Sequence, residues 1–277
     1  MSALLSESLP IRLACFDIEK TDLVSLFEDA ELTVDELVVP LPLFNRERCR
    51  YCGVCARYCP EQALHFNRYR PSLTLIAGRC NACGKCNTEC EHRGIQLKAR
   101  TGGYILQGHV QGQAFVAGRL ATPSSWMPLT KMMFRNLRAE VPTVLDLGPG
   151  LTGIHDYVLK RTDVAVVVVV HDDEWEGKLE GMLAAVATTG VNVAVLINHN
   201  KENTGEGFAE QVGGYCSEKG VPLIGTIPFE KELESLYRFA DVQQYAPSLG
   251  IFAPLWNRIL NMDFTEKEYH TESKITP

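Results

Sequence analysis

The sequence predicts an α/β fold: a mostly parallel β-sheet with helices on both faces, into which a small cysteine-rich α+β domain is inserted. Apolar stretches of strand length alternate with stretches of helical spacing from residue 144 to residue 260. Eight of the ten cysteines lie in two tight groups between residues 49 and 90. Strand-like segments stand on both sides of these groups. We therefore expect residues 1–44 and 102–277 to form one α/β domain, and residues 45–101 to form the inserted domain.

Each expected element rests on apolar spacing and on the residues that end it. The expected strands cover residues 11–16, 38–43, 104–110, 113–119, 144–147, 164–170, 191–198 and 221–227. The expected helices cover residues 129–139, 153–160, 175–188, 208–219, 231–239 and 252–260. Gly190 and Gly220 end two of these helices, because glycine is common just past a helix C-terminus. The strand at 164–170 is entirely apolar and nearly all valine, which is typical of a strand buried on both faces.

The composition is that of an ordinary globular protein. The 277 residues are 45% hydrophobic and 22% charged, enough for a sizeable core. The net charge of 27 − 34 = −7 gives no overall reason to expect nucleic acid as a partner. No apolar run reaches the roughly 18–20 residues of a membrane span, and the N-terminus lacks the basic start of a secretory signal. We expect a cytoplasmic protein, whose cysteines would stay reduced.

The cysteine groups are two copies of one pattern, C-x2-C-x2-C-x3-C. The first copy contains Cys49, Cys52, Cys55 and Cys59, and the second contains Cys80, Cys83, Cys86 and Cys90. The offset between them is 80 − 49 = 31 residues, and Gly53 matches Gly84 at the same offset. The region is therefore an internal duplication.

Three thiolates spaced three residues apart can wrap three corners of a cubane, while the fourth cysteine ligates the other cluster. We predict that one [4Fe–4S] cluster is held by Cys49, Cys52, Cys55 and Cys90. We predict that the second is held by Cys80, Cys83, Cys86 and Cys59. The region resembles a bacterial two-cluster ferredoxin, although Glu91 replaces the proline found in the first copy. The alternative is structural zinc, which also binds paired C-x2-C cysteines but requires neither the third nor the fourth cysteine of each copy.

The flanking sequence resembles the MinD/ParA/Mrp-type ATPases, one branch of which carries an inserted two-cluster ferredoxin domain at this position. The segment Val-Leu-Asp-Leu-Gly-Pro-Gly at 144–150 is similar to their Walker B segment, and residues 221–229 resemble their late strand and proline turn. The resemblance implies a nucleotide site in which Asp17 and Asp146 stand near Mg²⁺ and Asn198 stands near adenine.

The phosphate loop of that family, K-G-G-x-G-K-T/S, is missing. Neither Gly84-Lys85 nor Gly177-Lys178 is followed by Ser or Thr, and Cys15 replaces an aspartate of the family's D-x-D segment. Without the backbone N–H groups and the lysine of that loop, we expect no efficient ATP hydrolysis, and ATP with Mg²⁺ is a doubtful ligand. Two explanations stay open: an upstream segment encodes the loop, or the chain is a degenerate paralogue.

The predicted function is one-electron transfer through two low-potential [4Fe–4S] clusters on a MinD-like scaffold. One alternative is an ATPase that couples nucleotide turnover to cluster redox. The other is a scaffold or carrier that donates clusters. The expected partner is a redox protein or an intact MinD-like ATPase paralogue, in a homodimer or heterodimer. Residues 46–100 hold eleven Lys or Arg against four Glu, a net +7 that either solubilises the region or docks a partner.

Overall fold

The computed structural model describes residues 11–18, 31–110, 113–137, 141–148, 150, 153–199, 207–231, 250 and 252–262. The chain divides into two compact units. The first contains Met1–His155 with Ser235–Pro247, and the second contains Asp156–Glu234 with Ser248–Pro277. Within the described residues, no helix combines the length and apolar character needed to cross a membrane.

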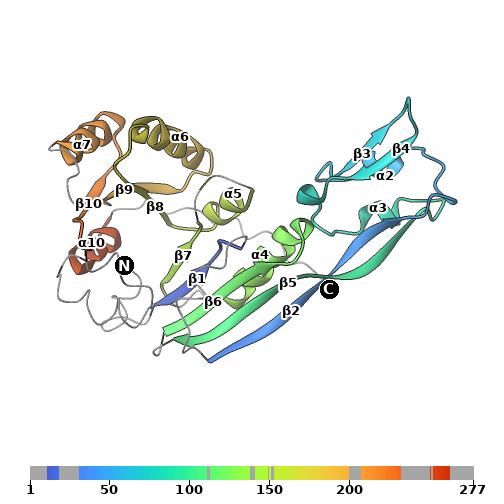
Figure 1. The fold of residues 1–277 in the computed structure, drawn as a ribbon, viewed down its shortest axis with the longest axis horizontal. Helices are drawn as coiled ribbons and strands as arrows, with labels where there is room; N and C mark the ends of the chain where they lie inside the picture. Colours follow the sequence, from blue (N-terminus) through green and yellow to red (C-terminus); the bar gives the residue numbers. More distant parts are fainter. Residues whose placement is uncertain are drawn as a thin grey trace. The chain divides into compact units, whose positions relative to one another are not determined.

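The first unit contains a mixed five-stranded sheet in the order β2-β5-β6-β1-β7 (Figure 1). Its strands are β1 Arg12–Cys15, β2 Glu31–Phe44, β5 Ile95–Val110, β6 Gln113–Leu120 and β7 Thr143–Asp146. β1 pairs in parallel with β6 and β7, whereas β2, β5 and β6 pair antiparallel, so this sheet is mixed and not mostly parallel as predicted. The antiparallel part arises because β2 leads into the cysteine region and β5 returns from it.

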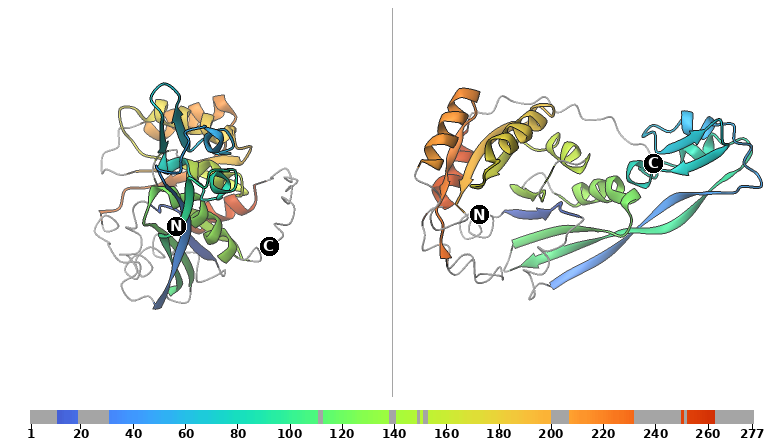
Figure 2. Two further views of the ribbon diagram at one scale, coloured as in Figure 1. Left: turned by 90° about the vertical axis from the view of Figure 1, so that its right-hand side faces the viewer. Right: turned by 45° about the horizontal axis from the view of Figure 1, so that its top comes forward.

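The two strands that flank the cysteine region are longer than predicted. β2 has 14 residues and β5 has 16, and they pair from Glu31↔His109 to Phe44↔Ile95. Together they form a long two-stranded ribbon, and the chain between its ends at Phe44 and Ile95 carries the cysteine repeat (Figure 2). β2 ends at Phe44, directly before the predicted domain boundary at residue 45, whereas β5 continues across the predicted boundary at residue 101.

The core of the first unit lies where helix α4, Trp126–Asn136, packs on the sheet. Leu129 and Met133 are fully buried there, and the rings of Phe16 and Phe134 lie 4.9 Å apart. Gly118 of β6 leaves the room for this packing, because a Cβ atom there would lie 2.5 Å from Met133 Sδ. Helix α4 begins earlier than the predicted residue 129, directly after the 3-10 turn η3, Pro123–Ser125.

The second unit contains a three-stranded parallel sheet in the order β10-β9-β8, as the alternating pattern predicted. Its strands are β8 Val164–Val169, β9 Asn192–Asn198 and β10 Leu223–Ile227. Its helices are α6 Trp175–Ala187, α7 Phe208–Lys219 and α10 Phe252–Leu260, and α5, Gly153–Leu159, joins the two units. Of the predicted helix at 231–239, only residue 231 lies within the described residues.

The prediction that the valine-rich strand is buried on both faces is wrong. Burial alternates along β8, and Val168 is 50% exposed, whereas Val167 and Val169 are buried. β8 stands at an edge of its sheet, and its buried side joins a core that includes Leu179 of α6 and Phe208 of α7. Alternation of this kind is expected when one face of a strand carries the packing.

The two cysteines outside the repeat are core residues. Cys15 is 1% exposed in β1, and Cys216 is 1% exposed in α7. Burial, and then the carboxylate of Asp146, raise the pKa of the Cys15 thiol to about 12. Burial also raises the pKa of Cys216. Both therefore remain protonated thiols at neutral pH.

Filling the space at Gly118 should destabilise the protein. Gly118→Val is expected to lower the free energy of unfolding by about 1–3 kcal/mol, because the added methyl groups meet Met133 and Ile18. Gly181→Ala is the control, since nothing lies within 4 Å of a Cβ atom there and alanine favours the helix. Thermal unfolding followed by circular dichroism compares the two, and equal midpoints would contradict the packing.

Cys15 and Cys216 should resist alkylation. The thiolate is the reactive form, and both side chains are protonated and buried, so iodoacetamide at neutral pH should modify neither residue in the native protein. The denatured protein should be modified at both positions. Peptide mass spectrometry gives the extent of labelling, and rapid modification of either residue before denaturation would contradict their placement.

Candidate functional site: two cysteine-lined cavities

The backbone of residues 41–98 repeats itself with the same offset of 31 as the sequence. Short helices α2, Val54–Arg57, and α3, Lys85–Thr88, occupy equivalent positions and each follows a left-handed glycine. The hairpin of β3, Leu64–Asn67, and β4, Ser72–Leu75, repeats the last four pairs of the β2–β5 ribbon. The duplication is therefore present in three dimensions.

Backbone hydrogen bonds join the two copies to each other. The N–H of Asn45 donates to the carbonyl of Gly94 over 2.8 Å, and the N–H of Ile76 donates to the carbonyl of Ala63 over 2.7 Å. Residues 45 and 76 are equivalent positions, as are residues 63 and 94. A residue near the start of each copy is therefore hydrogen-bonded to a residue near the end of the other copy.

The same loop geometry occurs in both copies. Tyr51 and Ala82 have φ of 51° and 57°, and Gln62 and Arg93 have φ of 48° and 52°. Non-glycine residues rarely adopt this left-handed region. Its recurrence at equivalent positions therefore shows that both copies use the same turn conformation.

The two glycines are required for packing as well as for backbone conformation. Gly53 has φ of 73°, and a Cβ atom there would lie 2.7 Å from the ring of Phe66. Gly84 has φ of 77°, and its Cβ atom would lie 3.2 Å from Leu97, the residue equivalent to Phe66. A side chain at either position would press on the hydrophobic wall behind the loop.

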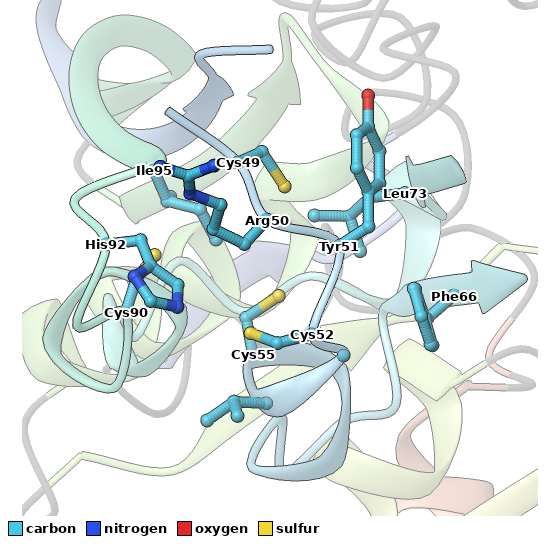
Figure 3. A pocket seen from close by; sticks show the side chains of 12 residues that line it. Cys49, Arg50, Tyr51, Cys52, Cys55, Phe66, Leu73, Cys90, His92 and Ile95 are labelled. Atoms are coloured by element: carbon cyan, nitrogen blue, oxygen red, sulfur yellow. The ribbon is translucent and has the colours of Figure 1, made fainter. Parts of the chain in front are cut away.

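Each copy borders a cavity, and the fourth cysteine of each copy lines the cavity of the other. The first cavity, about 380 Å³ including space open to solvent, is lined by Cys49, Cys52, Cys55 and Cys90 (Figure 3). The second cavity, about 360 Å³ on the same basis, is lined by Cys59, Cys80, Cys83 and Cys86. We call these sets the first and second quartets. They are the two groups of residues that the sequence predicted.

The quartets combine buried and exposed sulfurs. Cys55 and Cys80 are buried, whereas Cys52 and Cys83 are exposed. Burial, reinforced by neighbouring thiolates, raises the pKa of Cys55 and of Cys86 to about 11. Thiols in this state must lose protons to bind metal, so metal binding here should release protons.

The exchanged cysteines receive hydrogen bonds from the backbone. The N–H of Ala63 donates to Cys59 Sγ, and the N–H of Gly94 donates to Cys90 Sγ, each over 3.2 Å. Such bonds stabilise a thiolate and tune the potential of a cluster. None of the ten cysteines, all of which lie in the described residues, forms a disulfide. Within the same residues, no three His, Cys, Asp or Glu side chains group as ligands of a single metal ion.

Two of the three predicted nucleotide positions lie together. Asp146 ends β7 beside Cys15 of β1, whose thiol donates to Asp146 Oδ2 over 3.9 Å. Asp17 follows β1 and packs against Gly148, where a Cβ atom would lie 2.5 Å from Asp17 Cγ. Asn198 ends β9 in the second unit and is described only there.

Sequence reasoning missed two contacts around the second quartet. Trp126 Nε1 of α4 donates to the carbonyl of Gly78, two residues before Cys80, over 2.9 Å. Asn81, which lines the second cavity, donates through Nδ2 to Glu61 Oε1 over 2.9 Å. Nothing in the local sequence pattern signals either contact, because each joins residues that are distant along the chain.

Comparison with known proteins supports an iron–sulfur domain. Residues 42–65 match the family model described as a 4Fe-4S binding domain. No curated protein matches the chain. A plasmid partition protein from Borrelia burgdorferi is 11% identical, with a TM-score of 0.39, over 89% of this chain and 88% of that one. A putative plasmid partition protein from Borrelia burgdorferi B31, solved with bound AMPPNP, is 10% identical with the same TM-score over 89% of each chain.

Proposed function

We propose that the protein transfers single electrons through two [4Fe–4S] clusters, one in each cavity. The observation that carries the proposal is the arrangement of eight cysteines as two quartets, each completed by a cysteine of the other copy. The match of residues 42–65 to a 4Fe-4S binding domain supports it. Four thiolates around one cavity are the ligand set of a [4Fe–4S] cluster.

We call residues 45–101 the cysteine module, and its residues fit that role. The first quartet would hold one cluster and the second quartet the other, and each cluster, when bound, would accept or donate one electron. The left-handed turns fix the loops that carry the cysteines, and N–H groups support Cys59 and Cys90. The hydrophobic residues behind the loops, which include Leu64 and Ile95, limit water on the inner side.

The remaining parts of the proposal concern organisation and partners. Residues 45–101 would be a ferredoxin-like domain inserted into a MinD-like α/β domain, working in the cytoplasm with a redox protein or an intact MinD-like ATPase paralogue. Asp17, Asp146 and Asn198 would be the remnant of a nucleotide site.

The proximity of Asp17 and Asp146 favours a second candidate function, an ATPase coupled to cluster redox, if a phosphate loop is supplied from elsewhere. Transfer of iron and sulfide to an acceptor would instead indicate a carrier.

Elemental analysis tests the proposal. Protein purified without oxygen should contain about eight irons and eight sulfides per chain, and its broad visible absorption should bleach reversibly with dithionite. Reconstituted material should behave in the same way. Stoichiometric zinc with no sulfide would refute the iron–sulfur assignment.

A pair of double variants tests the exchange of the fourth cysteine. Cys52→Ala with Cys90→Ala removes two ligands of the first quartet only, so about four irons should remain. Cys52→Ala with Cys59→Ala removes one ligand from each quartet, so both sites should be damaged and less iron should remain. Iron and sulfide are measured in both proteins. The reverse order would show that each copy keeps its own fourth cysteine.

A further inference from the structure

We propose that the rim of the first cavity, formed by Arg50, Tyr51 and His92 around Cys52, is the docking surface for an acidic redox protein. The inference rests on the proposed function, and it distinguishes the two sites from each other. The first site would exchange electrons with the partner, and the second would lie behind it.

The duplication allows the two rims to be compared position by position. The first cavity is lined by Arg50, Tyr51 and His92, which Figure 3 shows among the side chains around the cysteines. The offset of 31 places Asn81, Ala82 and Glu61 at the equivalent positions of the second copy. At these three positions the first rim is therefore aromatic and basic, whereas the second has a small alanine and a pair of polar side chains, Asn81 and Glu61, that bond to each other.

The charges of the two rims also differ. Arg50 and His92 are exposed, and neither forms an ion pair with any described carboxylate. No residue that lines the first cavity is acidic. Lys85 lines the second cavity at the position that Val54 holds in the first, and Glu61 stands at the position equivalent to His92, so the formal charges of Lys85 and Glu61 sum to zero.

The second copy is also the one that faces the rest of the first unit. Trp126 Nε1 binds the carbonyl of Gly78, just before the second cysteine loop. The equivalent residue of the first copy is Glu47, which is exposed and which no hydrogen bond among the described residues joins to α4. The loop of the first copy is thus free of the contact with α4 that anchors its counterpart.

The charge of the module determines the kind of partner. All eleven Lys and Arg side chains of residues 46–100 are exposed, against four Glu, so the module is +7 before metal is bound. Opposite charge steers association and suppresses wrong partners. Arginine and tyrosine, both present on the first rim, are enriched at protein interfaces. An acidic redox protein fits both the positive charge of the module and the arginine and tyrosine of the first rim.

A matched pair of charge reversals tests the docking surface. Arg50→Glu changes the first rim, and Lys85→Glu makes the same change in charge at the second. The probe is oxidised flavodoxin, a small acidic redox protein, and its binding to the iron-loaded protein is measured by calorimetry at low and high salt. Cytochrome c, a basic redox protein, and a single-stranded DNA oligonucleotide are the comparison ligands. Iron is assayed in every sample.

Arg50→Glu should weaken flavodoxin binding by on the order of tenfold at low salt, Lys85→Glu by less than about twofold, and high salt should abolish the difference. Equal effects of the two variants, no binding of flavodoxin, or equal binding of cytochrome c would overturn the inference. DNA binding tighter than flavodoxin binding would overturn it in favour of nucleic acid. If these results came from protein with full iron content, only the docking surface would fail, whereas wild-type protein without iron would refute the proposed function itself.

Discussion

The cysteine module depends on one constraint: neither copy of the repeat is complete without the other. The first copy lacks the carbonyl of Gly94 that binds Asn45, and the second lacks the carbonyl of Ala63 that binds Ile76. The same exchange brings Cys90 to the first cavity and Cys59 to the second. Because backbone pairing and sulfur placement are exchanged together, each quartet is complete only when both copies are folded. Metal bound to either quartet would therefore stabilise both copies.

The ribbon of β2 and β5 connects this module to the rest of the first unit. A two-stranded ribbon alone is marginally stable, but here β5 also pairs with β6 and so belongs to the five-stranded sheet. The bond from Trp126 to Gly78 adds a second connection, between α4 and the loop of the second copy. These two connections give the copies different surroundings although their internal geometry is the same. The duplication thus yields two sites that share a sequence pattern but differ in their lining residues and in their contact with α4.

Much of this arrangement follows from the sequence, and the exceptions have physical causes. The quartets were predictable because a three-residue spacing limits which sulfurs can share a site. Helices at 208–219 and 252–260 have the predicted bounds, the former because glycines flank it. The start of β2 was missed because Asp35 and Glu36 lack strand character; Gln107 and Thr101 of β5 bind them. The exposure of Val168 was missed because an all-valine run does not reveal that only one face of the strand is packed.

The exchange of the fourth cysteine is tested most directly by diffraction at the iron absorption edge from crystals grown without oxygen. Eight irons should appear in two compact groups of four, with Cys90 contacting the group of the first cavity and Cys59 that of the second. Isolated single-metal peaks, or a contact from Cys59 to the group held by Cys49, Cys52 and Cys55, would contradict the account.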